Sequence, residues 1–139
     1  MIKNPDKWIR KGFAELVESN NISTIWDMNV TGGIYPKEYI LLSTQTKVDT
    51  QLTKCLGQWD CTMLLDIVTR YPATGNTGSR LKVNDIEEGI IANIDGLLVT
   101  GFSIFNIQLE SSTSLDSSDK DEMIYRQLMR YRIILDEND

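Results

Sequence analysis

The first twenty residues carry the hydrophobic period of an amphipathic helix. Apolar side chains recur at spacings of three and four residues, at Ile9, Phe13, Leu16 and Val17. Asn4 offers a capping side chain, Pro5 suits the first helical position, and Asp6 places an acid near the positive end of the helix dipole. Because Asn20 and the asparagine after it interrupt the pattern, we expect a helix of about four turns here.

The period then changes to two, which is typical of β-strands. Alternating stretches predict four strands, at residues 22–30, 38–50, 59–71 and 102–110. The third strand has apolar side chains on both faces near its middle, so we expect it to be central in the sheet and covered on each side. Asp60, Asp66 and Arg70 share one of its faces, and we interpret them as part of a cross-sheet ion pair rather than a catalytic site.

The alternation also assigns side chains to faces. In the second strand one face is predicted to hold Ile40, Leu42, Thr44, Thr46 and Val48. In the fourth strand one face is predicted to hold Ser103, Phe105, Ile107 and Leu109. Together with the helix, these assignments predict one core that contains Phe13, Leu16, Trp59, Met63, Leu65, Ile67, Phe105 and Ile107.

A second helix is predicted after the glycine-rich turn PATGNTGS at residues 72–79. Its apolar stripe has helical spacing, at Val83, Ile86, Ile90 and Ile94. The helix begins near Ser79 or Asn84. Asn84 with Glu87 three positions later has the spacing of a capping box, with asparagine in place of the usual serine or threonine.

The C-terminal third can be interpreted in two ways. Residues 110–121 contain six serines and threonines and one apolar side chain, Leu115, whereas residues 123–135 are apolar again and fit either a helix or a strand. As a strand, the second segment gathers its arginines on one face, at Arg126, Arg130 and Arg132. Tyrosine and isoleucine enrichment favours the strand. We therefore predict a long hairpin with residues 111–122 as a projecting polar loop at its tip.

These elements predict a single α+β domain over residues 1–139, with a mainly antiparallel sheet and the order α-β-β-β-α-β-β. A chain of 139 residues can bury one core, and its 41% hydrophobic and 24% charged residues are typical of globular proteins. No stretch approaches the roughly 20 apolar residues of a membrane span. The charged N-terminus does not match a secretory signal, so we expect synthesis in the cytoplasm and no membrane partner.

The composition disfavours catalysis, cofactors and metal ions. The chain has no histidine, the commonest general base at neutral pH, and no phosphate-binding loop. Cys55 and Cys61 cannot supply a four-ligand zinc site, so we expect free thiols. The acids around residue 120 lack the glycine and the spacing of a calcium loop. A net charge of −6, from 14 basic and 20 acidic residues, also disfavours a dedicated nucleic-acid binder.

The element order, the entry YPKEYILLS (35–43) into the second strand and the central strand pattern W-x-C-x-M-x-L-x-I (59–67) resemble a known family. They are similar to the tail-terminator and neck, or head–tail connector, ring proteins of tailed bacteriophages. The resemblance spans roughly residues 5 to 135 and rests on order, length and patterning. It carries no catalytic signature, and no functional residue is transferred by it.

The resemblance implies a structural role in the virion, with synthesis in the host cytoplasm. Members of that family are small α+β subunits that close into rings, usually of six and sometimes of twelve, around the DNA channel. The implied partners are copies of the same chain and an adjacent portal, connector ring or tail tube. DNA would pass through the lumen without specific binding, since an acidic wall repels phosphate.

The predicted projecting loop supplies the candidate interface, whose residues are Leu115, Asp116, Asp119, Asp121 and Glu122. A second interpretation of the same pattern is a small ferredoxin-like adaptor module that binds one protein partner without catalysis. The oligomeric state distinguishes the two, because only the first requires a ring.

Overall fold

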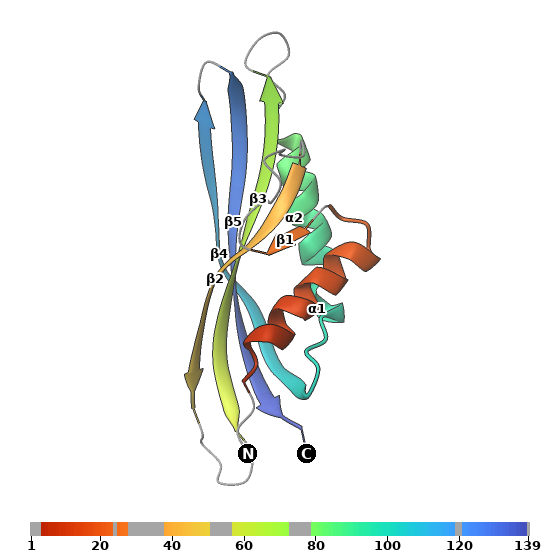
Figure 1. Ribbon diagram of the computed structural model, residues 1–139, viewed down its shortest axis with the longest axis vertical. Coiled ribbons are helices and arrows are strands. Elements are labelled where there is room, and N and C mark those ends of the chain that lie inside the picture. The colour runs from red at the N-terminus through yellow and green to blue at the C-terminus, as the bar shows by residue number, and fades with distance from the viewer. Residues whose placement is uncertain are drawn as a thin grey trace.

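In the described part of the chain, two helices pack on one face of a five-stranded sheet (Figure 1). The computed structural model describes residues 4–23, 25–27, 38–50, 57–72, 79–118 and 121–138. In chain order the elements are α1 (Asp6–Ser19), β1 (Ile25–Asp27), β2 (Glu38–Asp49), β3 (Gln58–Pro72), α2 (Leu81–Asn93), the 3-10 turn η1 (Ile94–Gly96), β4 (Phe102–Ser118) and β5 (Glu122–Glu137). The predicted α+β class and the order α-β-β-β-α-β-β are thus confirmed.

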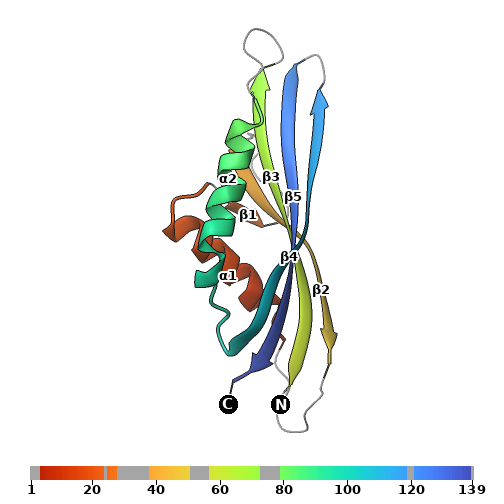
Figure 2. The same cartoon turned by 180° about the vertical axis from the view of Figure 1, so that it is seen from behind.

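The strands lie in the order β1-β2-β3-β5-β4, so β3 is central, as predicted. Neighbouring strands pair antiparallel, except that the short β1 runs parallel to β2. Figures 1 and 2 show both helices on the same side of a long, twisted sheet, and the upper ends of β3, β4 and β5 extend past them. Among the described residues both helices lie on one side of β3, and no helix covers the other side.

β1 is shorter than the strand predicted for residues 22–30. The strand comprises Ile25–Asp27, and residue 24 and residues 28–37 lie outside the described part of the chain. Ile22 lies instead in the turn that follows α1, since its backbone N–H donates to the Val17 carbonyl at 3.0 Å.

The two helices begin differently from the predicted caps. Pro5 precedes α1 and is not its first helical residue, while Asn4 Oδ1 accepts a hydrogen bond from the first helical N–H at 3.1 Å. α2 begins at Leu81, three residues before Asn84, so the predicted capping box is wrong. The hydroxyl of Ser79, the other candidate start, accepts from the Leu81 N–H at 3.3 Å.

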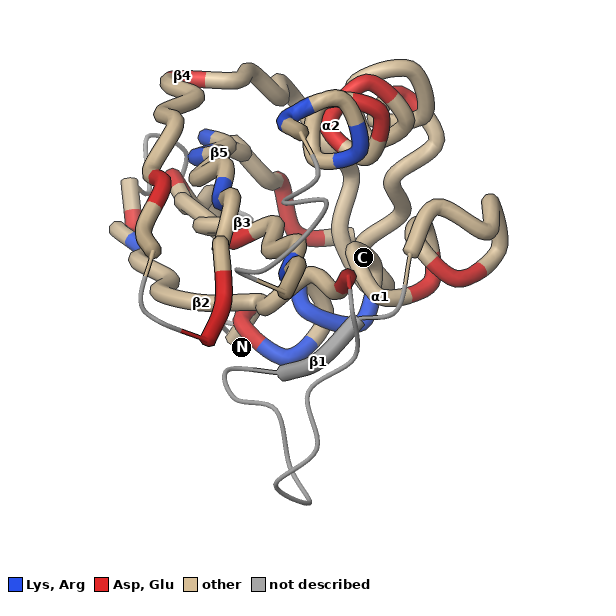
Figure 3. The backbone as a smooth tube through the Cα atoms, turned by 90° about the horizontal axis from the view of Figure 1, so that it is seen from above, with Lys and Arg blue, Asp and Glu red and all other residues tan. Residues whose placement is uncertain are grey.

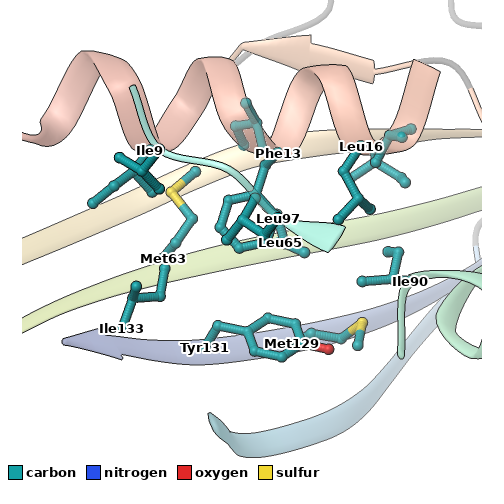
Figure 4. Close-up of a cluster of buried hydrophobic side chains, with 14 of the residues drawn as sticks. Ile9, Phe13, Leu16, Met63, Leu65, Ile90, Leu97, Met129, Tyr131 and Ile133 are labelled. Carbon is teal, nitrogen blue, oxygen red and sulfur yellow. The ribbon is translucent and has the colours of Figure 1, made fainter. Parts of the chain in front are cut away.

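The core lies between the helices and the central strands (Figure 4). Phe13 of α1 packs on Tyr131 of β5, with ring centroids 5.9 Å apart. Five of the eight predicted core residues are buried there, at Phe13, Leu16, Met63, Leu65 and Ile67. Gly12 lets α1 approach the chain after α2, because a Cβ at this position would lie 2.4 Å from the Leu98 carbonyl oxygen.

Phe105 is the predicted core residue that the structure places outside the core. A β-bulge lies between Ile104 and Asn106, which pair with consecutive residues of β5 and leave Phe105 as the extra residue. Phe105 is 69% exposed, while Ile104 and Ile107 both pack against the core. The face assignment for the fourth strand is therefore wrong, because a bulge breaks the period of two.

A second bulge changes the faces of β2. Ile40 and Leu42 are buried as predicted, but the register shifts between Leu42 and Gln45, so Thr46 and Val48 turn to the side without helices. Gln45 faces α1 in their place. Its side-chain amide donates to the backbone carbonyl of the first helical residue at 3.0 Å and its Oε1 accepts from the Arg10 Nε–H at 2.8 Å. The bulge thereby ties the start of α1 to the sheet.

The C-terminal hairpin is confirmed, but its tip is shorter than predicted. Residues 111–118 belong to β4 and pair in continuous register with residues 123–130 of β5. The polar composition of this segment marks an exposed strand, since serine and threonine side chains can face water on a hairpin arm. The loop predicted at 111–122 is thus mostly strand.

We expect Leu65→Ala to lower the free energy of unfolding by about 2–5 kcal/mol, because Leu65 is fully buried and its loss leaves a cavity. Phe105→Ala is the matched control and, in protein dilute enough to stay unassembled, should cost less than about 0.5 kcal/mol, as surface substitutions usually do. Denaturant titration measures both. Equal losses for the two variants would contradict the bulge and the core described here.

Cys61 is fully buried, and burial raises the pKa of its thiol to about 12. At pH 8 roughly one thiol in ten thousand is then ionised, so Cys61 should not react with a thiol reagent until the protein unfolds. The measurement is labelling of a Cys55→Ser variant with and without denaturant. Rapid stoichiometric labelling of the folded variant at pH 8 would show that β3 is accessible.

Candidate assembly surface

The open face is the side of the sheet that no helix covers in the described chain. It carries alternating apolar and charged side chains, at Asp60, Thr62, Leu64, Asp66, Val68 and Arg70 of β3 and at Ile124, Arg126, Leu128, Arg130, Arg132 and Ile134 of β5. Asp66 and Val68 are buried, and most of the others are half-buried. Neighbouring side chains of the same face contribute to this, since Arg126 contacts Asp66.

Cross-strand ion pairs neutralise much of this face. Arg126 donates to both oxygens of Asp66, at 3.2 and 2.5 Å, and Arg132 donates to both oxygens of Asp60, at 2.9 and 2.5 Å. The hydrogen bond from Arg132 lowers the pKa of Asp60. Two parallel N–H···O bonds fix both side chains of a pair, so these charges keep their partners if water is removed from the face.

Arg70 makes a third cross-strand pair near the far end of the sheet. Its Nη1 lies 2.5 Å from Glu122 Oε2, and its Nε–H donates to the Tyr39 hydroxyl at 3.1 Å. All three polar residues singled out on the central strand thus form ion pairs with β5, which confirms that interpretation. Their carboxylates face guanidinium groups and not each other, unlike the paired acids of a hydrolytic site.

Arg130 differs from the other open-face arginines. It is exposed, it lies opposite Leu64, and it forms no ion pair within the described part of the chain. The face thus combines half-buried apolar groups, satisfied ion pairs and one available cation. Such a mixture is typical of protein–protein interfaces, which are about as apolar as ordinary surface and enriched in arginine.

Arg80, which precedes α2, connects that helix to the hairpin arm, residues 111–118 and 122–130. The Arg80 guanidinium forms an ion pair with Asp116 and donates to Gln127 Oε1 at 2.5 Å and to Ser114 Oγ at 3.1 Å. Gln127 is buried, and its amide donates to Ser112 Oγ at 2.6 Å. This network supplies partners for buried polar groups and orders a stretch that has little apolar surface.

The structure does not gather the predicted interface residues into one patch. Leu115 lies on the open face, whereas Asp116 lies on the helix side with Arg80. Glu122 pairs with Arg70, Asp121 is exposed, and Asp119 lies outside the described residues. Sequence reasoning missed Arg80 and Gln127. The available signal was Gln127, which interrupts the apolar alternating face that β5 forms between residues 123 and 135.

The helix side has its own surface features. A hollow of about 340 Å³ lies between α1 and α2, lined among others by Leu16, Asn20, Asn93 and Leu98, and a second of about 280 Å³ adjoins it beside α2. Leu98 is 78% exposed at the first hollow.

Within the described ranges no group of three metal-ligating side chains occurs, and no helix is long and apolar enough to span a bilayer.

We expect Arg80→Met to cost about 1–3 kcal/mol of unfolding free energy, because Gln127 loses a partner in a buried position. Amide hydrogen exchange of residues 111–118 should accelerate more than that of β3. Lys82→Met is the control, since Lys82 forms one exposed ion pair with Glu38 at 3.5 Å and should cost less than about 1 kcal/mol. Unchanged exchange in the arm would show that Arg80 does not order it.

Comparison with known proteins gives a fold likeness only. No protein-family model matches the chain, and no curated protein matches its sequence. Among solved structures, a chain of the virion of a native gene transfer agent particle is similar, with a TM-score of 0.58 and 12% sequence identity. The likeness covers 92% of this chain and 91% of that one, so the two share a fold over nearly their whole length.

Proposed function

We propose that the protein is a structural subunit of the virion of a tailed bacteriophage or a similar particle. The observation that carries the proposal is the fold shared with a virion chain over 92% of this chain and 91% of that one. A likeness of this extent involves the helices as well as the sheet. The feature that the two chains share is therefore the architecture itself and not a local motif.

Within the virion we propose a place in a neck or tail ring that joins the head or portal to the tail around the DNA channel. The arrangement of the outer surfaces supports this finer assignment. The subunit has two broad outer surfaces, the open face and the helix side, on opposite sides of one slab (Figures 1 and 2). A subunit that uses two different surfaces for the same contact assembles head to tail, and such contacts close into rings when the rotation allows.

The negative net charge of the chain supports the proposal that DNA passes through the ring without being bound. Each copy contributes a net charge of −6, so a ring of six or twelve is strongly acidic. A lumen of that sign repels phosphate and leaves duplex DNA mobile. The arm end with Asp121 and Glu122 extends past the helices and is our candidate contact with an adjacent portal, connector or tail-tube protein.

We expect the purified protein to form closed rings whose mass is six or twelve times the subunit mass of 15.8 kDa. Native mass spectrometry over a range of concentrations measures the stoichiometry, and negative-stain images show whether the particles are annular. A chain that stays monomeric or dimeric up to high micromolar concentration would contradict the ring and favour the small adaptor module.

A further inference from the structure

Among the described residues, the large apolar side chains that remain exposed fall into two groups. Three come from strands of the sheet, at Val48, Phe105 and Leu115. Three come from α2 and the segment after it, at Leu81, Ile91 and Leu98. The helices cover one face of the sheet, so the outer side of α2 and the open face point in opposite directions (Figure 2). The subunit therefore carries an apolar group on each of two opposite sides.

The charges on the two sides are complementary. Asp85, Glu88 and Asp95 are exposed on α2 and its 3-10 extension, and none of them forms an ion pair in the part of the chain described. Arg130 on the open face is likewise exposed and unpaired there. Figure 3 shows acidic residues along α2 and basic residues along β5. An acidic helix surface thus corresponds to an available cation on the opposite side of the same molecule.

We propose that the open face of one copy, around Arg130, packs on the outer surface of α2 of a second copy, around Glu88. The partner is another copy of this chain, because one chain holds both halves of the charge and apolar match. This inference rests on the proposed ring function, and it names the contact by which the ring is built. The satisfied ion pairs beside Arg130 let the face lose water without leaving carboxylates unpaired.

Shape supports the same arrangement. Phe105 protrudes from the edge strand at its bulge, and the hollow of about 340 Å³ between α1 and α2 can accept a side chain of that size from a neighbour. Large aromatic residues inserted into pockets are the common anchors of protein interfaces. Because the two surfaces differ and lie on opposite sides, the contact repeats from copy to copy and does not stop at a dimer.

Charge reversal tests the contact. Arg130→Glu places a glutamate opposite the acids of α2, and Glu88→Arg places an arginine opposite Arg130, so each variant alone should raise the concentration for half-assembly at least about tenfold. Glu18→Arg, at the end of α1, is the matched control and should assemble normally.

An equimolar mixture of the two variants should assemble like wild type. In alternating order, the open face of the Arg130→Glu variant meets α2 of the Glu88→Arg variant, so opposite charges face each other with their signs exchanged. The next contact joins the unchanged Arg130 of the second variant to the unchanged Glu88 of the first, which is the wild-type pair.

The outcomes separate this contact from the ring itself. If both single variants still form rings like those of the wild type, the proposed contact is wrong. The same holds if the variants assemble more weakly and mixing them does not restore assembly. Either result leaves the ring proposal standing. A wild-type chain that never assembles overturns both. Circular dichroism and thermal melting verify that each variant folds, and Asp85→Arg provides a second α2 variant with the same expected loss and the same rescue. Native mass spectrometry measures the oligomeric state of each variant and of each mixture.

Discussion

The uninterrupted pairing of β3 with β5 is the constraint on which the rest of the structure depends. Fifteen residues of β3 oppose fifteen of β5, from Gln58 with Asp136 to Pro72 with Glu122, without a register shift. Because side chains alternate strictly along this pair, one face collects the core and the other collects the ion pairs. Each ion pair joins neighbours across this ladder, so a slip of one residue would bury the arginines and expose the core.

The outer strands are less regular, and this explains which predictions failed. The sequence predicts the helices, the central strand, the hairpin and the polar set of β3, because these follow an unbroken period. It does not predict the faces of β2 and β4, where bulges after Leu42, Ile104 and Leu109 insert an extra residue. A bulge depends on the pairing partner and leaves no clear mark in the strand's own sequence. Phe105 is the clearest example.

The hairpin arm illustrates a second limit of sequence reasoning. Its run of serines and threonines predicts a loop, because it cannot bury enough apolar surface to offset its ordering cost. The structure supplies the missing stabilisation from far along the chain. Arg80 at the start of α2 contacts Ser114, Asp116 and Gln127, and β5 provides the backbone partners. Local composition does not reveal a partner more than thirty residues away, although Gln127 alone on an apolar face indicated one.

Because the helices lie on one side of the sheet, the subunit has two different outer surfaces. The proposed function depends on both of them. The proposed contact joins these two surfaces of neighbouring copies, because both carry exposed apolar side chains and their unpaired charges have opposite signs. The most direct measurement is hydroxyl-radical footprinting of Phe105 and Leu115 in dilute and in assembled protein. The account predicts strong protection of both upon assembly, together with protection of Leu98. Oligomers that form while these three side chains stay fully reactive would contradict it.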